Sequence, residues 1–154
     1  MKKKADDSEL IVYSAAMEDG DVEFFNDPVL LENMRNKCLA ILEEGVSADA
    51  HYLLAVYHIQ KGETDKANIE RLKAAYLGHC PAIIDYSSRA DDGMSIEILG
   101  IVKAMNNAGE HLGSAQEDFD DSLSGLSPED EEKINSIARK VKESMELYGL
   151  SFQW

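Results

Sequence analysis

Two histidines, His51 and His58, form the pair in this chain that most resembles a set of metal ligands. They lie seven positions apart, so they share one face if the segment is helical. A zinc-binding helix instead carries its two histidines four positions apart and needs a third ligand, which the sequence does not place. The pair is therefore interpreted as ordinary surface or groove histidines, and no metal or other cofactor is expected.

The neighbouring residues His79 and Cys80 could be imagined as a base and a nucleophile. No acid lies at a spacing that would orient the histidine, so the sequence does not support a catalytic dyad. The second cysteine, Cys38, lies 42 positions away from Cys80, and neither belongs to a CxxC motif. Both are predicted to be buried free thiols, which points to a reducing cytoplasm.

An acidic run at residues 19–23 has the composition of a calcium-binding loop. However, Phe24 stands where the loop needs a glycine to turn, and Leu30 stands where it needs a bidentate glutamate. A solvated acidic turn is the interpretation that remains. Since the chain also contains no Walker loop, GxSxG or GxGxxG motif, it is not expected to be an enzyme.

Capping residues, prolines and glycines divide the chain into helices, which predicts an all-α protein. The signals include Asp27-Pro28 before one helix and Ser47, Ser95 and Ser127 before three others. One of the phenylalanines at 24–25 is expected to pack as a hydrophobic staple on the helix that follows. Helices are expected at residues 8–19, 28–44, 48–60, 64–77, 81–89, 95–105 and 128–148.

Residues 110–126 are predicted to form a weakly structured acidic segment, either a loop or a short, poorly specified helix. The apolar tail at residues 150–154 is expected to pack back on its own domain rather than to serve as a binding motif. At 154 residues and 44% hydrophobic content, the whole chain, 1–154, is predicted to be a single domain.

Acidic residues outnumber basic ones by 30 to 15, which gives a net charge of −15. Direct nucleic-acid binding is not expected from a protein without a basic surface. No apolar stretch is long enough to span a membrane.

The acidic residues are unevenly distributed along the chain. Residues 5–34 carry nine acids without Lys or Arg, and so do residues 104–132, whereas residues 35–89 carry seven of each sign. The two acid-only stretches predict strongly negative faces, although high net charge also serves solubility alone.

Three glycines, Gly45, Gly78 and Gly109, lie 33 and 31 positions apart, each at the end of the second helix of a predicted pair. A period in the low thirties built from helix pairs is typical of stacked helical repeats. Residues 48–82 hold the best-defined unit, with Leu54-Ala55, Gly62, Asp65-Lys66-Ala67, Lys73-Ala74-Ala75, Gly78 and Ala82.

This unit resembles a tetratricopeptide repeat, and Lys73-Ala74-Ala75, Gly78 and Ala82 follow the KAAxxGxxxA pattern of the Sel-like repeats common in bacteria. The flanking units are degenerate, because the one after Ala82 has Asp-Asp-Gly where the repeat signature should stand. The resemblance implies a short right-handed α-solenoid of about three helix-turn-helix repeats plus a C-terminal helix. Small alanines are expected where the helix backbones cross closely.

Proteins of this family are adaptors that hold partners, so the resemblance implies a non-catalytic protein-protein interaction module. The predicted partner-binding residues are Tyr57, His58 and Arg71 on the repeat, and Asp118, Asp120 and Asp121 in the acidic segment. Alanine at the first three is expected to weaken binding with little loss of stability. The partner is expected to be a protein with a basic surface.

A narrower alternative is a bacterial immunity protein that neutralises a cognate toxin, for instance a basic nuclease, by covering its active site. A further alternative, a small enzyme or metal-binding protein, has no motif in its favour.

Overall fold

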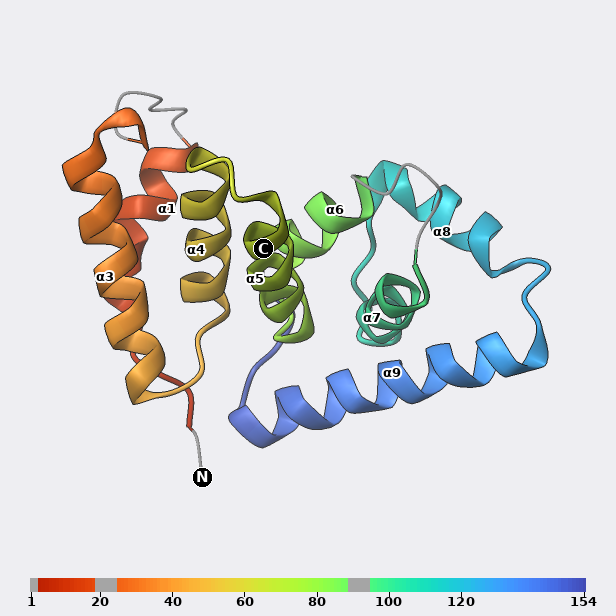
Figure 1. Cartoon of the computed structure of the whole chain (residues 1–154). Helices are drawn as coiled ribbons and strands as arrows, with labels where there is room; N and C mark the ends of the chain where they lie inside the picture. The colour runs from red at the N-terminus through yellow and green to blue at the C-terminus, as the bar shows by residue number, and fades with distance from the viewer. Residues whose placement is uncertain (1–2, 19–24, 89–94) are drawn as a thin grey trace. The chain divides into compact units, whose positions relative to one another are not determined.

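The computed structural model describes residues 3–18, 25–88 and 95–154, and this part of the chain is all-helical, as predicted. It forms two compact units, Met1–Ala74 and Ala75–Trp154, so the single domain predicted from the sequence contains two such units. None of the helices in the described ranges has the length and apolar character that a membrane span requires. The elements are η1 (Ser8–Leu10), α1 (Ile11–Glu18), α3 (Pro28–Glu44), α4 (Ala48–Gln60), α5 (Thr64–Tyr76), α6 (Cys80–Ser88), α7 (Ile96–Asn107), η2 (Gly113–Ala115), α8 (Gln116–Leu123) and α9 (Pro128–Tyr148) (Figure 1).

Helix starts at Asp27, Ser47, Ser95 and Ser127 are confirmed, because each of these side chains caps a helix. The carboxylate of Asp27 accepts hydrogen bonds from the first backbone N–H groups of α3, at 2.9 and 3.3 Å. Each serine hydroxyl accepts from the N–H three residues later, at 3.1, 3.3 and 3.1 Å. Such a cap contributes about 1 kcal/mol, because it satisfies a backbone donor that the helix leaves unpaired.

The beginning of the first helix differs from the prediction. An α-helix was expected from residue 8, but Ser8–Leu10 form the 3-10 helix η1 and α1 begins at Ile11. The Ser8 N–H and hydroxyl donate to Asp6 Oδ1 at 3.1 and 2.7 Å. These two hydrogen bonds lower the pKa of the Asp6 carboxyl. The expected end of this helix, residues 19–20, and the first residue of the Phe24-Phe25 pair lie outside the described ranges. Phe25 is partly buried against the core of the first unit.

The first unit has a core contributed mainly by η1, α3 and α4. Its buried residues in α3 and α4 lie at helical spacing. The whole set is Ala5, Leu10, Leu31, Met34, Cys38, Ile41, Ala50, Leu53, Leu54 and Tyr57. A short parallel bridge joins the segment before η1 to Val46, two residues after the end of α3. Ala5 N–H donates to Val46 O at 2.8 Å, and Val46 N–H donates to Lys3 O at 2.7 Å. A Cβ on Gly45 would lie 2.1 Å from Lys3 O, so this close approach of two backbones requires glycine.

Helices α4 and α5 form the hairpin that corresponds to the best-defined repeat. The turn between them places Gly62 at φ 73°, a left-handed conformation that glycine adopts without strain. The alanines expected at close crossings, Ala55, Ala67, Ala74 and Ala82, are all buried, with exposed fractions of at most 1%. These alanines are therefore buried, and their place at close crossings of the helix backbones stays a prediction.

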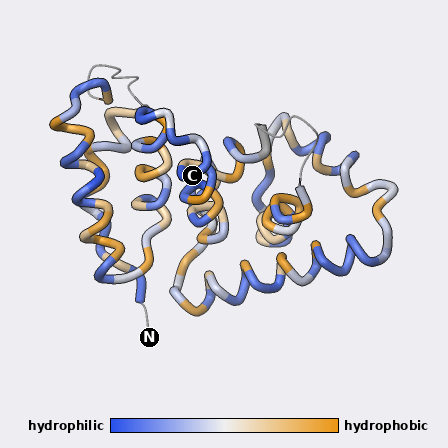
Figure 2. The backbone as a smooth tube through the Cα atoms, in the orientation of Figure 1, coloured by the Kyte–Doolittle hydropathy of each residue, from blue (hydrophilic) through white to orange (hydrophobic). Residues whose placement is uncertain are grey.

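The second unit is built on the packing of α7 against α9. Helix α7 is largely apolar, whereas α9 alternates apolar and polar residues along its length (Figure 2). The helical spacing predicts a buried face of α9 formed by Ile134, Ile137, Ala138, Val141 and Met145. All of these are buried except Ile137, which is partly buried. A Cβ on Gly100 of α7 would lie 2.4 Å from Ile137 Cγ2, so glycine allows the two helices to come this close.

The tail after α9 packs back on its own unit, as expected. Cys80 N–H donates to Gln153 O at 2.7 Å, and Gln153 N–H donates to Gly78 O at 2.8 Å. Gly78 has φ 85°, and a Cβ there would lie 2.6 Å from Met145 Cε. Trp154 remains 64% exposed, and its indole N–H donates to Glu110 Oε2 at 2.9 Å.

Candidate functional site

The acidic segment 110–126 contains a short ordered helix, α8. Phe119 lies at the centre of this helix and is only 3% exposed, so its ring fastens α8 to the second unit. Four carboxylates on the helix, those of Glu117, Asp118, Asp120 and Asp121, are exposed to solvent. The fold thus presents these acids on one anchored helix.

The carboxylates of α8 have few interactions within the described part of the chain. Among the described residues, no Lys or Arg forms an ion pair with any of the four, and Asp120 accepts only a hydrogen bond from the Gln116 amide at 3.2 Å. The acids at the start of α9 differ, because Lys133 lies 3.3 Å from Glu129, and Arg139 lies 3.5 Å from Glu132. Within the described residues, α8 therefore carries four exposed carboxylates with which no cation pairs.

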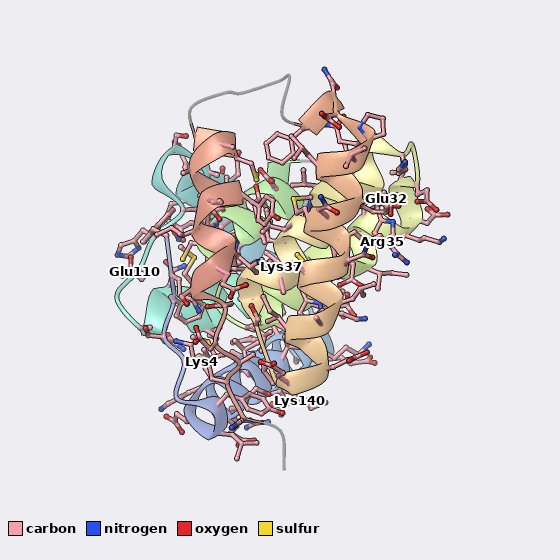
Figure 3. The ribbon with its side chains drawn as sticks, turned by 90° about the vertical axis from the view of Figure 1, so that its left-hand side faces the viewer. Lys4, Glu32, Arg35, Lys37, Glu110 and Lys140 are labelled. Carbon is pink, nitrogen blue, oxygen red and sulfur yellow. The ribbon has the colours of Figure 1, made fainter. Side chains whose placement is uncertain are left out.

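Tyr57 of the predicted repeat groove lies in a network of charged side chains in the first unit. Its hydroxyl donates to Glu32 Oε1 at 2.7 Å, and this hydrogen bond lowers the pKa of Glu32, with help from the charges of Lys61 and Arg35. The cationic groups of Arg35 and Lys61 lie 5.7 and 5.6 Å from the centre of the Tyr57 ring. Figure 3 shows Glu32 and Arg35 together on one side of α3, away from Lys37.

His58 and Arg71, the other two predicted groove residues, also have partners within the protein. His58 Nδ1 lies 3.2 Å from Glu63 Oε1, and Arg71 donates to Asn68 Oδ1 at 2.7 Å. Arg71 is only 2% exposed and Tyr57 only 8%. Because the side chains of Arg71 and Tyr57 pack in the interior, replacing either with alanine should lower the stability of the fold. The expectation that stability would be nearly unchanged is therefore revised for these two residues. Whether the three residues contact a partner stays a prediction.

His51 pairs with a carboxylate on the neighbouring helix, α5. Its Nδ1 lies 2.6 Å from Glu70 Oε2, and each side chain is 17% exposed. Burial raises the pKa of Glu70, but the hydrogen bond and charge of His51, together with the charge of Lys73 at 3.6 Å, outweigh burial and lower it. This contact joins α4 to α5 and was not found from the sequence, because its partners are 19 positions apart on different helices.

Of the neighbouring residues His79 and Cys80, the first caps a helix and the second is a buried free thiol. His79 Nδ1 accepts a hydrogen bond from Ala82 N–H at 3.2 Å, so the imidazole caps α6. Burial, followed by the charge of Glu110, raises the pKa of Cys80 to about 11, and burial likewise raises that of Cys38 to about 12. Thiols held this far from ionisation are poor nucleophiles at neutral pH.

Metal binding has no support in the described ranges, where no three His, Cys, Asp or Glu side chains form a group that could hold an ion. The acidic run at residues 19–23, which has the composition of a calcium-binding loop, lies outside those ranges.

Sequence reasoning missed one concave feature of the second unit, a pocket between α7, α9 and the tail. Its residues are far apart in the sequence, so only the tertiary packing brings them together. The predicted acids Asp118, Asp120 and Asp121 belong to this same unit, whereas Tyr57, His58 and Arg71 belong to the first.

No family model matches this chain, and no curated protein or solved structure matches it either.

Proposed function

We propose that the chain is a non-catalytic protein-binding module and that α8 is the docking surface for a partner with a basic surface. The observation that carries the proposal is the set of four exposed carboxylates on α8 without a neutralising cation among the described residues. Because Phe119 anchors the helix, a partner would meet these charges in a fixed arrangement. Fixed charges of one sign attract an oppositely charged protein and orient it during encounter.

The proposal includes the helical-repeat character that the sequence implies. The α4–α5 hairpin, with its buried small residues and the left-handed turn at Gly62, supports a repeat of the tetratricopeptide or Sel-like type within a short α-solenoid. In this proposal the protein works in the cytoplasm, where buried free thiols such as Cys38 and Cys80 persist.

A narrower form of the proposal is that the partner is a toxin of the basic nuclease kind and that the chain is its immunity protein. Nuclease active sites bind phosphate with positive charge, and the four carboxylates of α8 offer negative charge to the same kind of surface. Binding there would compete with the nucleic-acid substrate.

The test compares two variants that lose the same amount of negative charge at different places. In the first, the α8 acids are replaced (E117Q, D118N, D120N, D121N). In the control, four exposed acids elsewhere are replaced (E43Q, E44Q, D65N, E143Q). Proteins captured by the wild type from the native cell are identified by mass spectrometry, purified and used to measure association rates at low and physiological salt.

We expect the α8 variant to associate at least about tenfold more slowly than the control variant, since steering by local charge accounts for factors of about 10 to 1,000. The wild-type rate should also fall steeply as salt is added. Cytochrome c, a basic protein that is not the partner, shows how much of the attraction is general. Equal association rates for the two variants would refute α8 as the docking surface.

A further inference from the structure

A pocket of about 650 Å³ lies in the second unit, lined by the C-terminal half of α7, by α9 and by the tail. Its apolar lining includes Ala104, Ala138, Met145, Leu150 and Phe152. A volume of this size is in the range of sites that hold small organic molecules. The pocket is separate from the four carboxylates of α8, none of which lines it.

Positive charge gathers in this pocket although the unit around it is strongly acidic. Residues 75–154 contain six Lys and Arg and 15 Asp and Glu. Three of the six cations, Lys103, Arg139 and Lys142, line the pocket, but only one of the 15 acids, Glu146, does so. The pocket therefore carries the opposite charge balance to its surroundings.

Lys103 is the cation best placed to hold a ligand. It is half-buried on α7, and its ammonium donates to the amide oxygen of Asn135 on α9. This oxygen carries no formal charge, and no carboxylate in the described ranges forms an ion pair with Lys103, so the positive charge is not compensated. Because the amide oxygen of Asn135 is occupied, its NH₂ group is the part of the side chain that can donate to a ligand.

The other two cations are held only weakly. Arg139 lies 3.5 Å from Glu132, and Lys142 lies 3.9 Å from Glu146, and all four side chains are well exposed. Exposed ion pairs of this kind contribute little and exchange readily with water or a ligand. An anion entering the pocket could therefore recruit both cations at low cost.

We propose that this pocket binds a small amphipathic carboxylate. The carboxylate accepts hydrogen bonds from Lys103 and Asn135, and the apolar body of the ligand packs against Ala138, Met145 and Phe152. A compact pocket that combines one uncompensated ammonium with an apolar lining selects for a single anionic head on an apolar body. An uncharged analogue would leave the ammonium unpaired, and a cationic analogue would be repelled.

The test uses octanoate as the probe, with octanol and octylammonium as the uncharged and cationic analogues, each titrated by calorimetry into the full chain. The variant Lys103→Met removes the charge and keeps the length of the side chain. The matched control is Lys140→Met, which removes an exposed cation of α9 that does not line the pocket (Figure 3). Ala108→Trp places an indole at an exposed position of the pocket lining and should fill the space without disturbing the core.

We expect saturable octanoate binding with a Kd that rises at least about tenfold in Lys103→Met, since a lost charged hydrogen bond of this kind typically costs that much affinity. The Kd should change less than about twofold in Lys140→Met, and binding should be lost in Ala108→Trp. Thermal unfolding of each variant shows that it is folded. Three results would each overturn the proposal. They are equal Kd values in the two lysine variants, octanol binding as tightly as octanoate, and no saturation of the wild type at millimolar octanoate.

Discussion

Replacing Gly100 with alanine tests the close approach of α7 and α9. The new Cβ would lie 2.4 Å from Ile137 Cγ2, 2.5 Å from Ile137 Cβ and 3.2 Å from Ile134 O. A Cβ cannot rotate away from its own backbone, so α7 and α9 must move apart to relieve the contact. The same seam carries the hydrogen bond between Lys103 and Asn135, so the pocket should widen as well.

The magnitude follows from two opposing effects. Alanine in a helix is favoured over glycine by about 1 kcal/mol. Overpacking of a well-packed interface costs about 1 to 3 kcal/mol, and the rigid contact with Ile137 Cβ places Gly100→Ala near the upper end. The net expectation is a loss of about 2 kcal/mol in the free energy of unfolding, which corresponds to a fall in Tm of roughly 6 °C for a chain of this length.

Urea unfolding followed by circular dichroism measures this loss. The control is Glu97→Ala, at an exposed position of the same helix, which should change stability by less than about 0.5 kcal/mol. Adding Ile137→Ala to Gly100→Ala removes the Cγ2 contact, so the double mutant should be about 1 kcal/mol more stable than the sum of the single changes predicts. A Gly100→Ala protein as stable as the wild type would refute the close helix contact.

Three further predictions concern buried groups. Glu70→Gln should cost on the order of 1 kcal/mol at neutral pH. Because the pKa of Glu70 in contact with His51 is lowered from 4.5, this difference should shrink as the pH falls through that lowered value, and a difference that persists at pH values below it would contradict the reasoning. Cys38 and Cys80, with pKa values of about 12 and 11, should resist Ellman's reagent at pH 8 until urea unfolds the protein, and rapid labelling of the native state would show that their burial is wrong. Gly78→Ala should lower Tm by several degrees, because φ 85° strains alanine and its Cβ meets Met145; an unchanged melting curve would argue against this turn.

The helices could be predicted because their signals are local. Asp27, Ser47, Ser95 and Ser127 each cap the helix that follows within three residues, so a short stretch of sequence contains the whole interaction. The contacts that shape the candidate sites are not local. For example, Lys103 meets a residue 32 positions away on another helix, and nothing in the sequence near it indicates that contact.

The burial of polar side chains could not be predicted from the sequence either. Arg71 was predicted to bind a partner on the repeat surface, yet the structure leaves it only 2% exposed, which is rare for arginine. The helix in the acidic segment could not be predicted because its single buried apolar residue, Phe119, gives too little periodicity to indicate a helix.

Gly45 was interpreted as the equivalent of Gly78, but its φ of 172° is ordinary extended backbone. The backbone of Lys3 is what excludes a side chain there.

The bridge between His79 and Gln153 has a consequence for synthesis of the protein on the ribosome. Its two partners lie 74 residues apart, so the strand-like contact that completes the second unit cannot form until residue 153 has left the ribosome. The equivalent contact of the first unit, between Lys4 and Val46, becomes available after far fewer residues have been made. The first unit can therefore begin to fold during translation, whereas the backbone contacts of His79 and Cys80 with the tail form only after residue 153 has been made.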